Sequence, residues 1–259
     1  MASTAPGTVV VDADIAPVVV GDLERRELIN PAWYAEPMLL NSLHLRAGGA
    51  YGNPAGNTQH DEYWYLLEGA GQVRLGSGAQ AETAQVAAGT AVQIPAAQAW
   101  ELVAEQPTWL LSFLVPAPIT PFAQALAKPV GQVIHVSALG QQDAQAATAD
   151  RQYEVLFDAK RGSRGATMFV GFIPTSGAPE HYHLYDEICV IVRGSGTLHT
   201  TDRRQSIGVG SAFHVAPRLL HALENPNPED LWVLGVFRPE GSAAAAYYPD
   251  GRPAPNNED

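Results

Sequence analysis

Basic residues and cysteine are scarce in this sequence. It has 15 Lys and Arg against 27 Asp and Glu, which gives a formal net charge of −12 at pH 7. No cluster of Lys or Arg breaks that balance, so no nucleic acid partner is expected. The one cysteine, Cys189, cannot form an internal disulfide. The chain also lacks a nucleophile elbow, a phosphate-binding glycine loop and a paired-cysteine zinc motif, which argues against the enzyme classes that those motifs mark.

Long apolar runs are absent as well. No stretch approaches the roughly 20 consecutive apolar residues that cross a bilayer, and residues 1–17 have neither a basic leader nor a long apolar segment. We therefore expect a cytoplasmic protein with no membrane role. With 259 residues, 46% hydrophobic and 16% charged, the chain has the composition of a packed globular protein. Its length suits one large all-β domain or two small ones.

Short runs rich in Leu, β-branched and aromatic residues alternate with Gly and Pro, which predicts an all-β fold. The runs form two series: MLLNSLHLRA, YWYLLEG, QVRLGSG, TAVQIPA and TWLLSFLVP, then ATMFVGFIP, EICVIVRG, GTLHTT, SAFHVAP and LWVLGVFRP. Glu62 and Gly69 match Glu187 and Gly194 at an offset of 125 residues. A repeat of about 120 residues indicates two copies of a whole domain rather than a repeat array.

The repeat predicts the domain boundaries. We place an N-terminal domain at residues 1–118, a linker at 119–152, a C-terminal domain at 153–243 and a tail at 244–259. The linker is rich in Pro, Ala and Gln, which favours one or two short helices. The less patterned ends of the chain are either arms that wrap the partner domain or disordered termini.

Four residues of the second copy have the chemistry and spacing of a metal site. His181 and His183 are two apart, so on a strand both imidazoles point to the same face. Glu187 opens the next predicted strand on the same surface, and His221 begins a later one. Three imidazoles and a carboxylate suit one divalent transition metal, with Fe, Mn or Ni favoured and Zn or Cu possible. The alternative is that the four are surface or core residues without a metal.

The two stretches that hold these residues also resemble a known family. Residues 181–194 have the form His-x-His-x3-Glu-x6-Gly, and residues 221–225 have the form His-x3-Asn. This resembles the two motifs of the cupin superfamily, over residues 38–116 and 164–239. The resemblance implies an all-β protein of two tandem cupin (double-stranded β-helix, or jelly-roll) barrels with a few short helices. It also implies that the three histidines and the glutamate bind one metal in the C-terminal barrel. The chain departs from the family at Thr175 and Arg218, where the motifs have glycine.

The first copy has lost most of these residues. The corresponding positions are Gly56, Thr58, Glu62 and Trp100, so only the carboxylate remains. A lone carboxylate cannot hold a metal tightly. We therefore predict a degenerate, metal-free N-terminal barrel in which Trp100 fills the place of an imidazole. His60 is interpreted as a polar residue at a strand entry rather than as a ligand.

Residues beyond the ligands are harder to assign. Cys189 shares the strand parity of Glu187 and is expected inside the second barrel as a small buried hydrophobe. His199, His214 and Glu224 are weak candidates for acid–base catalysis because they lie near the ligands in sequence. The catalytic residues otherwise remain unassigned.

The leading interpretation is a metal-dependent enzyme that acts on a small organic molecule. An oxygen-dependent, dioxygenase-like oxidation is the first hypothesis, by analogy within the superfamily. One alternative is a redox-neutral isomerase, cyclase, lyase or hydrolase that uses the metal as a Lewis acid. Another is a small-molecule binding protein without catalysis. A homodimer is possible, because exposed sheet edges pair readily between subunits.

Overall fold

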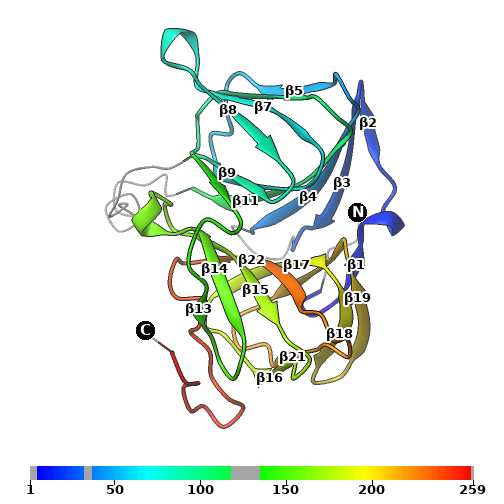
Figure 1. Ribbon diagram of the computed structural model, residues 1–259, viewed down its shortest axis with the longest axis vertical. Coiled ribbons are helices and arrows are strands. Elements are labelled where there is room, and N and C mark those ends of the chain that lie inside the picture. Colours follow the sequence, from blue (N-terminus) through cyan, green and yellow to red (C-terminus); the bar gives the residue numbers. More distant parts are fainter. Residues whose placement is uncertain (1–4, 32–36, 118–134, 258–259) are drawn as a thin grey trace.

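The computed structural model describes residues 5–31, 37–117 and 135–257, and it contains two β-barrels that lie one above the other (Figure 1). Each barrel consists of one seven-stranded and one four-stranded sheet. Every pairing between the named strands is antiparallel, as a jelly roll requires. The predicted all-β fold of two tandem barrels is confirmed.

The first barrel is built from the N-terminal half of the chain. Its seven-stranded sheet has the order β12-β9-β6-β11-β4-β3-β2, and its four-stranded sheet has the order β5-β10-β7-β8. The bounds are β2 (Val18–Val20), β3 (Leu23–Ile29), β4 (Leu39–Leu45), β5 (Ala50–Asn53), β6 (His60–Glu68), β7 (Ala70–Leu75), β8 (Glu82–Ala87), β9 (Thr90–Ile94), β10 (Trp100–Ala104), β11 (Thr108–Pro116) and β12 (Val136–Ala138).

The second barrel repeats this arrangement. Its sheets have the orders β1-β20-β17-β22-β15-β14-β13 and β16-β21-β18-β19. The bounds are β1 (Val10–Val11), β13 (Gln145–Ala146), β14 (Gln152–Phe157), β15 (Thr167–Ile173), β16 (Ala178–His181), β17 (Asp186–Arg193), β18 (Ser195–Thr200), β19 (Arg204–Gly208), β20 (Ser211–Val215), β21 (His221–Glu224) and β22 (Leu231–Arg238).

The helices of the described residues are short. They are the 3-10 helices η1 (Asp12–Asp14), η2 (Gly78–Gln80) and η3 (Ala159–Arg161). None of the helices in this part of the chain has the length and apolar character needed to span a membrane. Of the segment predicted as a helical linker, residues 119–134 lie outside the described residues, and residues 135–151 contain the strands β12 and β13 instead of a helix.

Two short strands at the ends of the first barrel's part of the chain complete the edges of the two seven-stranded sheets. β1, at the start of the chain, pairs with β20 of the second barrel, with Val10 opposite Ala212. β12, which follows the first barrel, returns to it and pairs with β9, with Ser137 opposite Ala91. The N-terminal segment is therefore an arm that reaches the partner domain, one of the two possibilities that the sequence left open.

The two faces of β17 line different interiors of the molecule. Glu187, Cys189 and Ile191 point into the second barrel, as strand alternation predicts. Ile188 and Val190 point the other way, into an apolar core that the two seven-stranded sheets share. That core also contains Tyr63 and Phe113 from the first barrel, and Leu156 and Leu234 from the second. Packing between the barrels therefore fixes the strand that carries Glu187.

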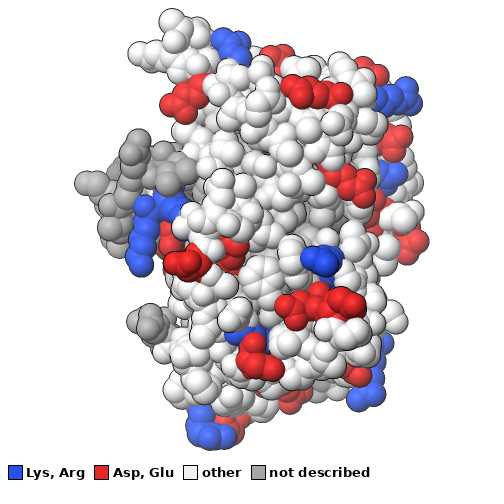
Figure 2. Space-filling model, in the orientation of Figure 1, with Lys and Arg blue, Asp and Glu red and all other residues white. Residues whose placement is uncertain are grey.

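The face of the molecule seen in Figure 2 carries its charges without large patches. Figure 2 shows acidic side chains spread over one face, with Lys and Arg in small, separated groups. Among the described residues on that face there is no continuous basic patch of the kind that binds nucleic acid.

The shared core predicts that the barrels unfold together. Leu234 is fully buried in it, so Leu234→Ala should lower the free energy of unfolding by about 2–5 kcal/mol. Urea titration followed by far-UV circular dichroism and by tryptophan fluorescence should give one shifted transition with both signals. Val209→Ala is the control, because Val209 is 48% exposed, and its effect should stay within about 0.5 kcal/mol. Two separate transitions, only one of which moves, would contradict the shared core.

Candidate metal centre

The interior of the second barrel contains a small cavity. Its volume is about 60 Å³, enough for a ligand of a few heavy atoms. Its wall combines aliphatic and aromatic side chains with a small set of polar ones. The lining residues are Ala147, Arg151, Gln152, Tyr153, Phe169, Gly171, Ile173, His181, His183, Tyr185, Glu187, Cys189, His221, Leu223, Val233, Ala243, Ala244 and Ala246.

Three histidines converge on this cavity. Nitrogens of His181, His183 and His221 all lie within 4.8 Å of one another, and all three side chains are buried. Strand pairing explains the convergence, because β16 and β21 are antiparallel neighbours in which His181 lies opposite His221. His183 follows two residues after His181 and approaches from the same side. The structure thus brings together the three imidazoles that the sequence singled out.

Each imidazole is held by a backbone carbonyl. The Nδ1 atoms lie 2.7 Å from the carbonyl oxygen of Pro179 for His181, 2.7 Å from that of Ala245 for His183 and 3.0 Å from that of Leu219 for His221. A carbonyl oxygen can only accept, so each Nδ1 carries the proton. In a neutral ring, Nε2 is then left with a bare lone pair. This tautomer is the one in which a histidine binds a metal through Nε2.

Burial keeps the three rings neutral. Loss of hydration lowers the pKa of His183 to about 3 and that of His221 to about 4, and it lowers the pKa of His181 well below its ordinary value. Mutual repulsion among the rings and the nearby positive charge of Arg151 lower the pKa of His181 further. Neutral imidazoles are ready to bind a cation because they need not first release a proton.

Glu187 lies beside the histidines but is not a member of the three-residue cluster. Its Oε2 is 3.8 Å from Nε2 of His183. Burial raises its pKa to about 7, partly offset by a hydrogen bond from the Cys189 thiol. A β-carbon at Gly235 would lie 2.7 Å from Oε1 of Glu187, so the glycine makes room for the carboxylate. Glu187 is thus placed where it can reach a cation held by the imidazoles.

The turn before His221 shows how the chain tolerates its departure from the family motif. Arg218 stands where the motif has glycine, and its φ is +67°, in the left-handed region. Its amide donates to the carbonyl of His183 at 2.8 Å, which ties the turn to the first pair of ligands. Ala97, the equivalent residue of the first barrel, has a φ of +64°. Both barrels therefore keep the glycine-type turn without the glycine.

The three weak candidates for acid–base catalysis do not line the cavity. His199 and Glu224 pair with each other at 2.7 Å on the outer side of their sheet. His214 is buried, 2.5 Å from Asp186, and it shares the strand parity of Ala212 in the core between the barrels. Neighbourhood in sequence was a poor guide here, because alternate residues of a strand face opposite sides.

The cavity instead contains groups that the sequence analysis did not select. Arg151 and Tyr185 line it, and the tail contributes Ala244, Ala246 and the carbonyl that holds His183. The tail is fixed across the barrel mouth by a pair of backbone hydrogen bonds between Tyr182 and Tyr247, each 2.9 Å long. No local signal marks Arg151 or Ala245, because both approach the histidines only through the fold.

The interior of the first barrel is filled differently. Trp100 is buried there and packs edge-on against Trp64 and Tyr51, with ring centroids 4.6 and 4.9 Å apart. Glu62 accepts a hydrogen bond from Trp64 Nε1 at 3.2 Å. Indole rings therefore occupy the space that the histidines line in the second barrel, and His60 begins β6.

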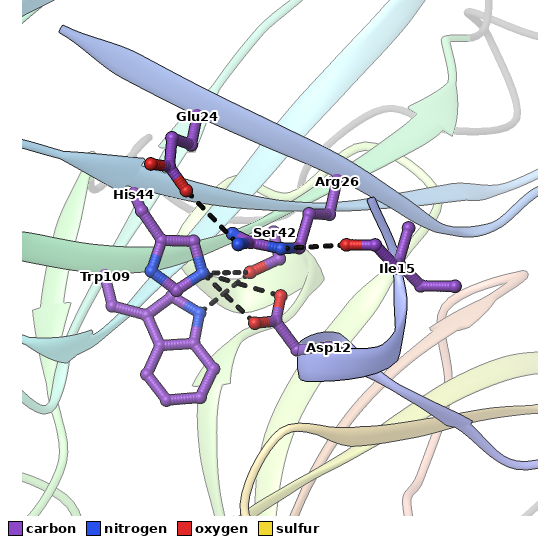
Figure 3. Close-up of polar contacts among 7 residues, drawn as sticks. All are labelled: Asp12, Ile15, Glu24, Arg26, Ser42, His44 and Trp109. Atoms are coloured by element: carbon purple, nitrogen blue, oxygen red, sulfur yellow. Dashed lines mark hydrogen bonds and ion pairs between the residues drawn. The ribbon is translucent and has the colours of Figure 1, made fainter. Parts of the chain in front are cut away.

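A second constellation, at the junction of the N-terminal arm with the first barrel, resembles a catalytic triad in composition only. Figure 3 shows Asp12, Ser42 and His44 in contact beside Trp109. Nε2 of His44 lies 3.2 Å from both Ser42 Oγ and Asp12 Oδ2. A triad needs the acid on one ring nitrogen and the hydroxyl on the other. Because Trp109 Nε1 also donates to Ser42 at 2.8 Å, we interpret this network as an anchor for the arm.

The neutral histidines predict how the metal-free protein responds to acid. The unfolded chain protonates the three imidazoles below about pH 6.5, whereas the folded state keeps His183 and His221 neutral to about pH 4 and holds the pKa of His181 well below its ordinary value. Glu187 has the opposite effect. Its pKa is raised to about 7, so at pH 5 the folded state binds one proton there that the unfolded state mostly lacks. At pH 5 the unfolded state therefore binds about two more protons, three minus one, and stability should fall by about 2–3 kcal/mol per pH unit on acidification.

In urea titrations, the stability of chelator-treated protein should change little near pH 7, and its dependence on pH should steepen to this slope as pH approaches 5. His221→Leu should reduce the proton difference behind the slope by about one, because it removes one of the three buried imidazoles. A slope of the opposite sign would show that the imidazoles are charged in the folded protein.

Comparison with known proteins agrees with this architecture. Residues 168–237 match the cupin domain family. Among solved structures, a structure of oxalate decarboxylase has a TM-score of 0.72 at 14% identity, and the match covers 93% of this chain and 80% of that one. A Bacillus subtilis oxalate decarboxylase variant has a TM-score of 0.71 at 13% identity with the same coverage.

A further structure, concerned with the Mn(II) centres of Bacillus subtilis oxalate decarboxylase, also has a TM-score of 0.71, at 14% identity. A comparison with curated proteins gave no match. At this level of identity the likeness concerns the fold. The chain therefore has the two-domain cupin fold, with a cupin domain at residues 168–237.

Proposed function

We propose that the protein is an enzyme that uses one divalent transition metal, held by His181, His183, His221 and Glu187 in the C-terminal barrel, to act on a small organic molecule. The observation that carries the proposal is the set of three Nδ1–carbonyl hydrogen bonds, which leave three bare Nε2 atoms beside one another in a buried cavity. Three bare imidazole nitrogens within 4.8 Å of one another form a donor set that a divalent cation can bind.

The donor set favours a redox-capable metal. Three imidazoles and one carboxylate suit Fe, Mn or Ni, with Zn or Cu as further options. Manganese gains support because a protein of the same fold contains Mn(II) centres. Such an ion, when bound, supplies a centre that can exchange electrons with dioxygen or polarise a bound oxygen atom.

The chain's own groups define what kind of chemistry the cavity favours. Phe169, Ile173, Leu223 and Val233 form an apolar wall that limits the entry of water. Backbone carbonyls fix the ring planes of the histidines, so a ligand meets donors that need no reorganisation. A dry, preorganised pocket of this kind supports the first hypothesis, an oxygen-dependent oxidation.

Metal content tests the proposal. After loading with Mn²⁺ or Fe²⁺ and desalting, elemental analysis should find about one equivalent per chain. His181→Ala and His221→Ala should each retain less than about a tenth of that amount, because each removes a buried ligand. His199→Ala and Glu62→Gln are matched controls and should retain the full amount. Equal metal content in all five proteins would contradict the site.

Oxygen dependence tests the type of reaction. Turnover of a substrate found by metabolite screening should stop under anaerobic conditions and resume when oxygen is admitted. Protein loaded with Zn²⁺, which has no redox chemistry, should be inactive. Full activity without oxygen, retained with zinc, would replace the oxidation by an isomerase, lyase or hydrolase reaction. Binding of metabolites without any conversion would indicate a binding protein.

A further inference from the structure

The cavity of the second barrel contains the side chain of Arg151, whose positive charge is felt by Glu187 and Asp150 without a direct ion pair to either. Arg151 uses Nε to donate to the carbonyl of Thr148 at 3.0 Å. Among the described residues, no carboxylate forms an ion pair with its guanidinium. The adjacent acid, Asp150, instead accepts a hydrogen bond from Ser176 at 2.5 Å. The outer nitrogens of the guanidinium are therefore left for a ligand in the cavity that Arg151 lines.

A rigid hairpin holds Arg151 in place. The turn between β13 and β14 is closed by a hydrogen bond of 2.9 Å from the Ala147 amide to the Arg151 carbonyl, and Ala149 adopts a left-handed φ of +62°. Asn256, in the tail, donates to the carbonyl of Ala147 at 3.1 Å. The guanidinium is thus anchored by its own hairpin and by the segment that covers the barrel mouth.

Tyr185 supplies a second unused donor. Its ring is stacked between His183 and Phe237, with centroid distances of 4.5 and 4.0 Å. The side chain is 8% exposed, and its hydroxyl has no hydrogen-bond partner in the protein. A buried hydroxyl without a partner is rare, since it loses hydration without compensation. The stacking fixes the direction of this hydroxyl, so a ligand can supply the missing acceptor.

Arg151 and Tyr185 belong to the same cavity as the histidines. All of them line it, and Arg151 is close enough to disfavour protonation of each of the three imidazoles. The cavity of about 60 Å³ limits its ligand to a few heavy atoms. A guanidinium fork matches the geometry of a carboxylate, and a phenol hydroxyl adds a single donor.

We infer that Arg151 and Tyr185 form an acid-group subsite, and that the ligand of this cavity is a small organic acid whose carboxylate binds there while its other end faces the three histidines. The second half of this statement rests on the proposed metal centre. The first half rests on the partnerless hydroxyl of Tyr185 and on the guanidinium of Arg151, whose Nε alone is used, on Thr148. The subsite thereby defines the substrate class, which the sequence left open.

The test compares small acids with their neutral amides. Lactate and malonate, paired with lactamide and malonamide, are titrated calorimetrically into the protein, with the metal content of each sample measured. Each acid should bind at least about tenfold more tightly than its amide. Arg151→Gln should weaken binding of the acids by about tenfold or more, and Tyr185→Phe by a few-fold, with no change for the amides.

Matched variants separate the possible outcomes. Arg204→Gln removes one exposed positive charge on β19 and should leave binding unchanged. Arg151→Lys keeps the charge without the fork, and intermediate affinity would show that the fork matters. Acids that bind no better than amides, or equal effects of Arg151→Gln and Arg204→Gln, would overturn the subsite. Arg151-dependent binding in a protein that takes up no metal would uphold the subsite and reject the proposed metal centre.

Discussion

The orientation of three imidazole rings by three backbone carbonyls is the constraint on which the site depends. Each carbonyl comes from a different part of the chain: Pro179 in β16, Leu219 in the turn before β21, and Ala245 in the C-terminal tail. Backbone acceptors cannot be lost by a side-chain rotation, so the Nε2 lone pairs keep their direction. The centre is therefore a property of the folded barrel and its tail together.

The core between the two barrels supports the strand that carries Glu187. In β17, Glu187 lines the cavity and Ile188 lies in the core between the barrels, so packing with the first barrel fixes the position of the strand. β1, at the start of the chain, pairs with β20 and so ties the N-terminal arm to the second barrel. A first barrel whose interior is filled by Trp64 and Trp100 thus has a clear structural role.

Sequence reasoning succeeded where periodicity and short motifs carry the information. Strand alternation predicts that His181 and His183 share a face. The internal offset predicts two barrels in which Trp100 occupies the position equivalent to that of His221. It did not identify Arg151, Tyr185 or Ala245 as parts of the site. Arg151 is 30 residues from the first histidine, and the role of Ala245 belongs to its carbonyl, which no side-chain pattern encodes. The unpartnered state of the Tyr185 hydroxyl is visible only once its surroundings are packed.

The candidates for acid–base catalysis show the same dependence on the fold. Closeness to the ligands along the chain suggests His199 and His214, but strand parity turns His199 toward solvent and His214 toward the core between the barrels. Within the predicted linker, pairing with neighbouring sheets gives residues 136–138 and 145–146 extended structure, and residues 119–134 lie outside the described residues. Tertiary pairing thus overrides the compositional preference at residues 136–138 and 145–146.

The most direct measurement is a crystal structure of metal-loaded protein, with diffraction data collected on both sides of the absorption edge of the metal. We expect one anomalous peak per chain inside the second barrel, about 2.0–2.2 Å from Nε2 of each of the three histidines, with a Glu187 oxygen at a similar distance. An anomalous signal elsewhere, or none after loading, together with Nε2 atoms that point away from one another, would contradict this expectation.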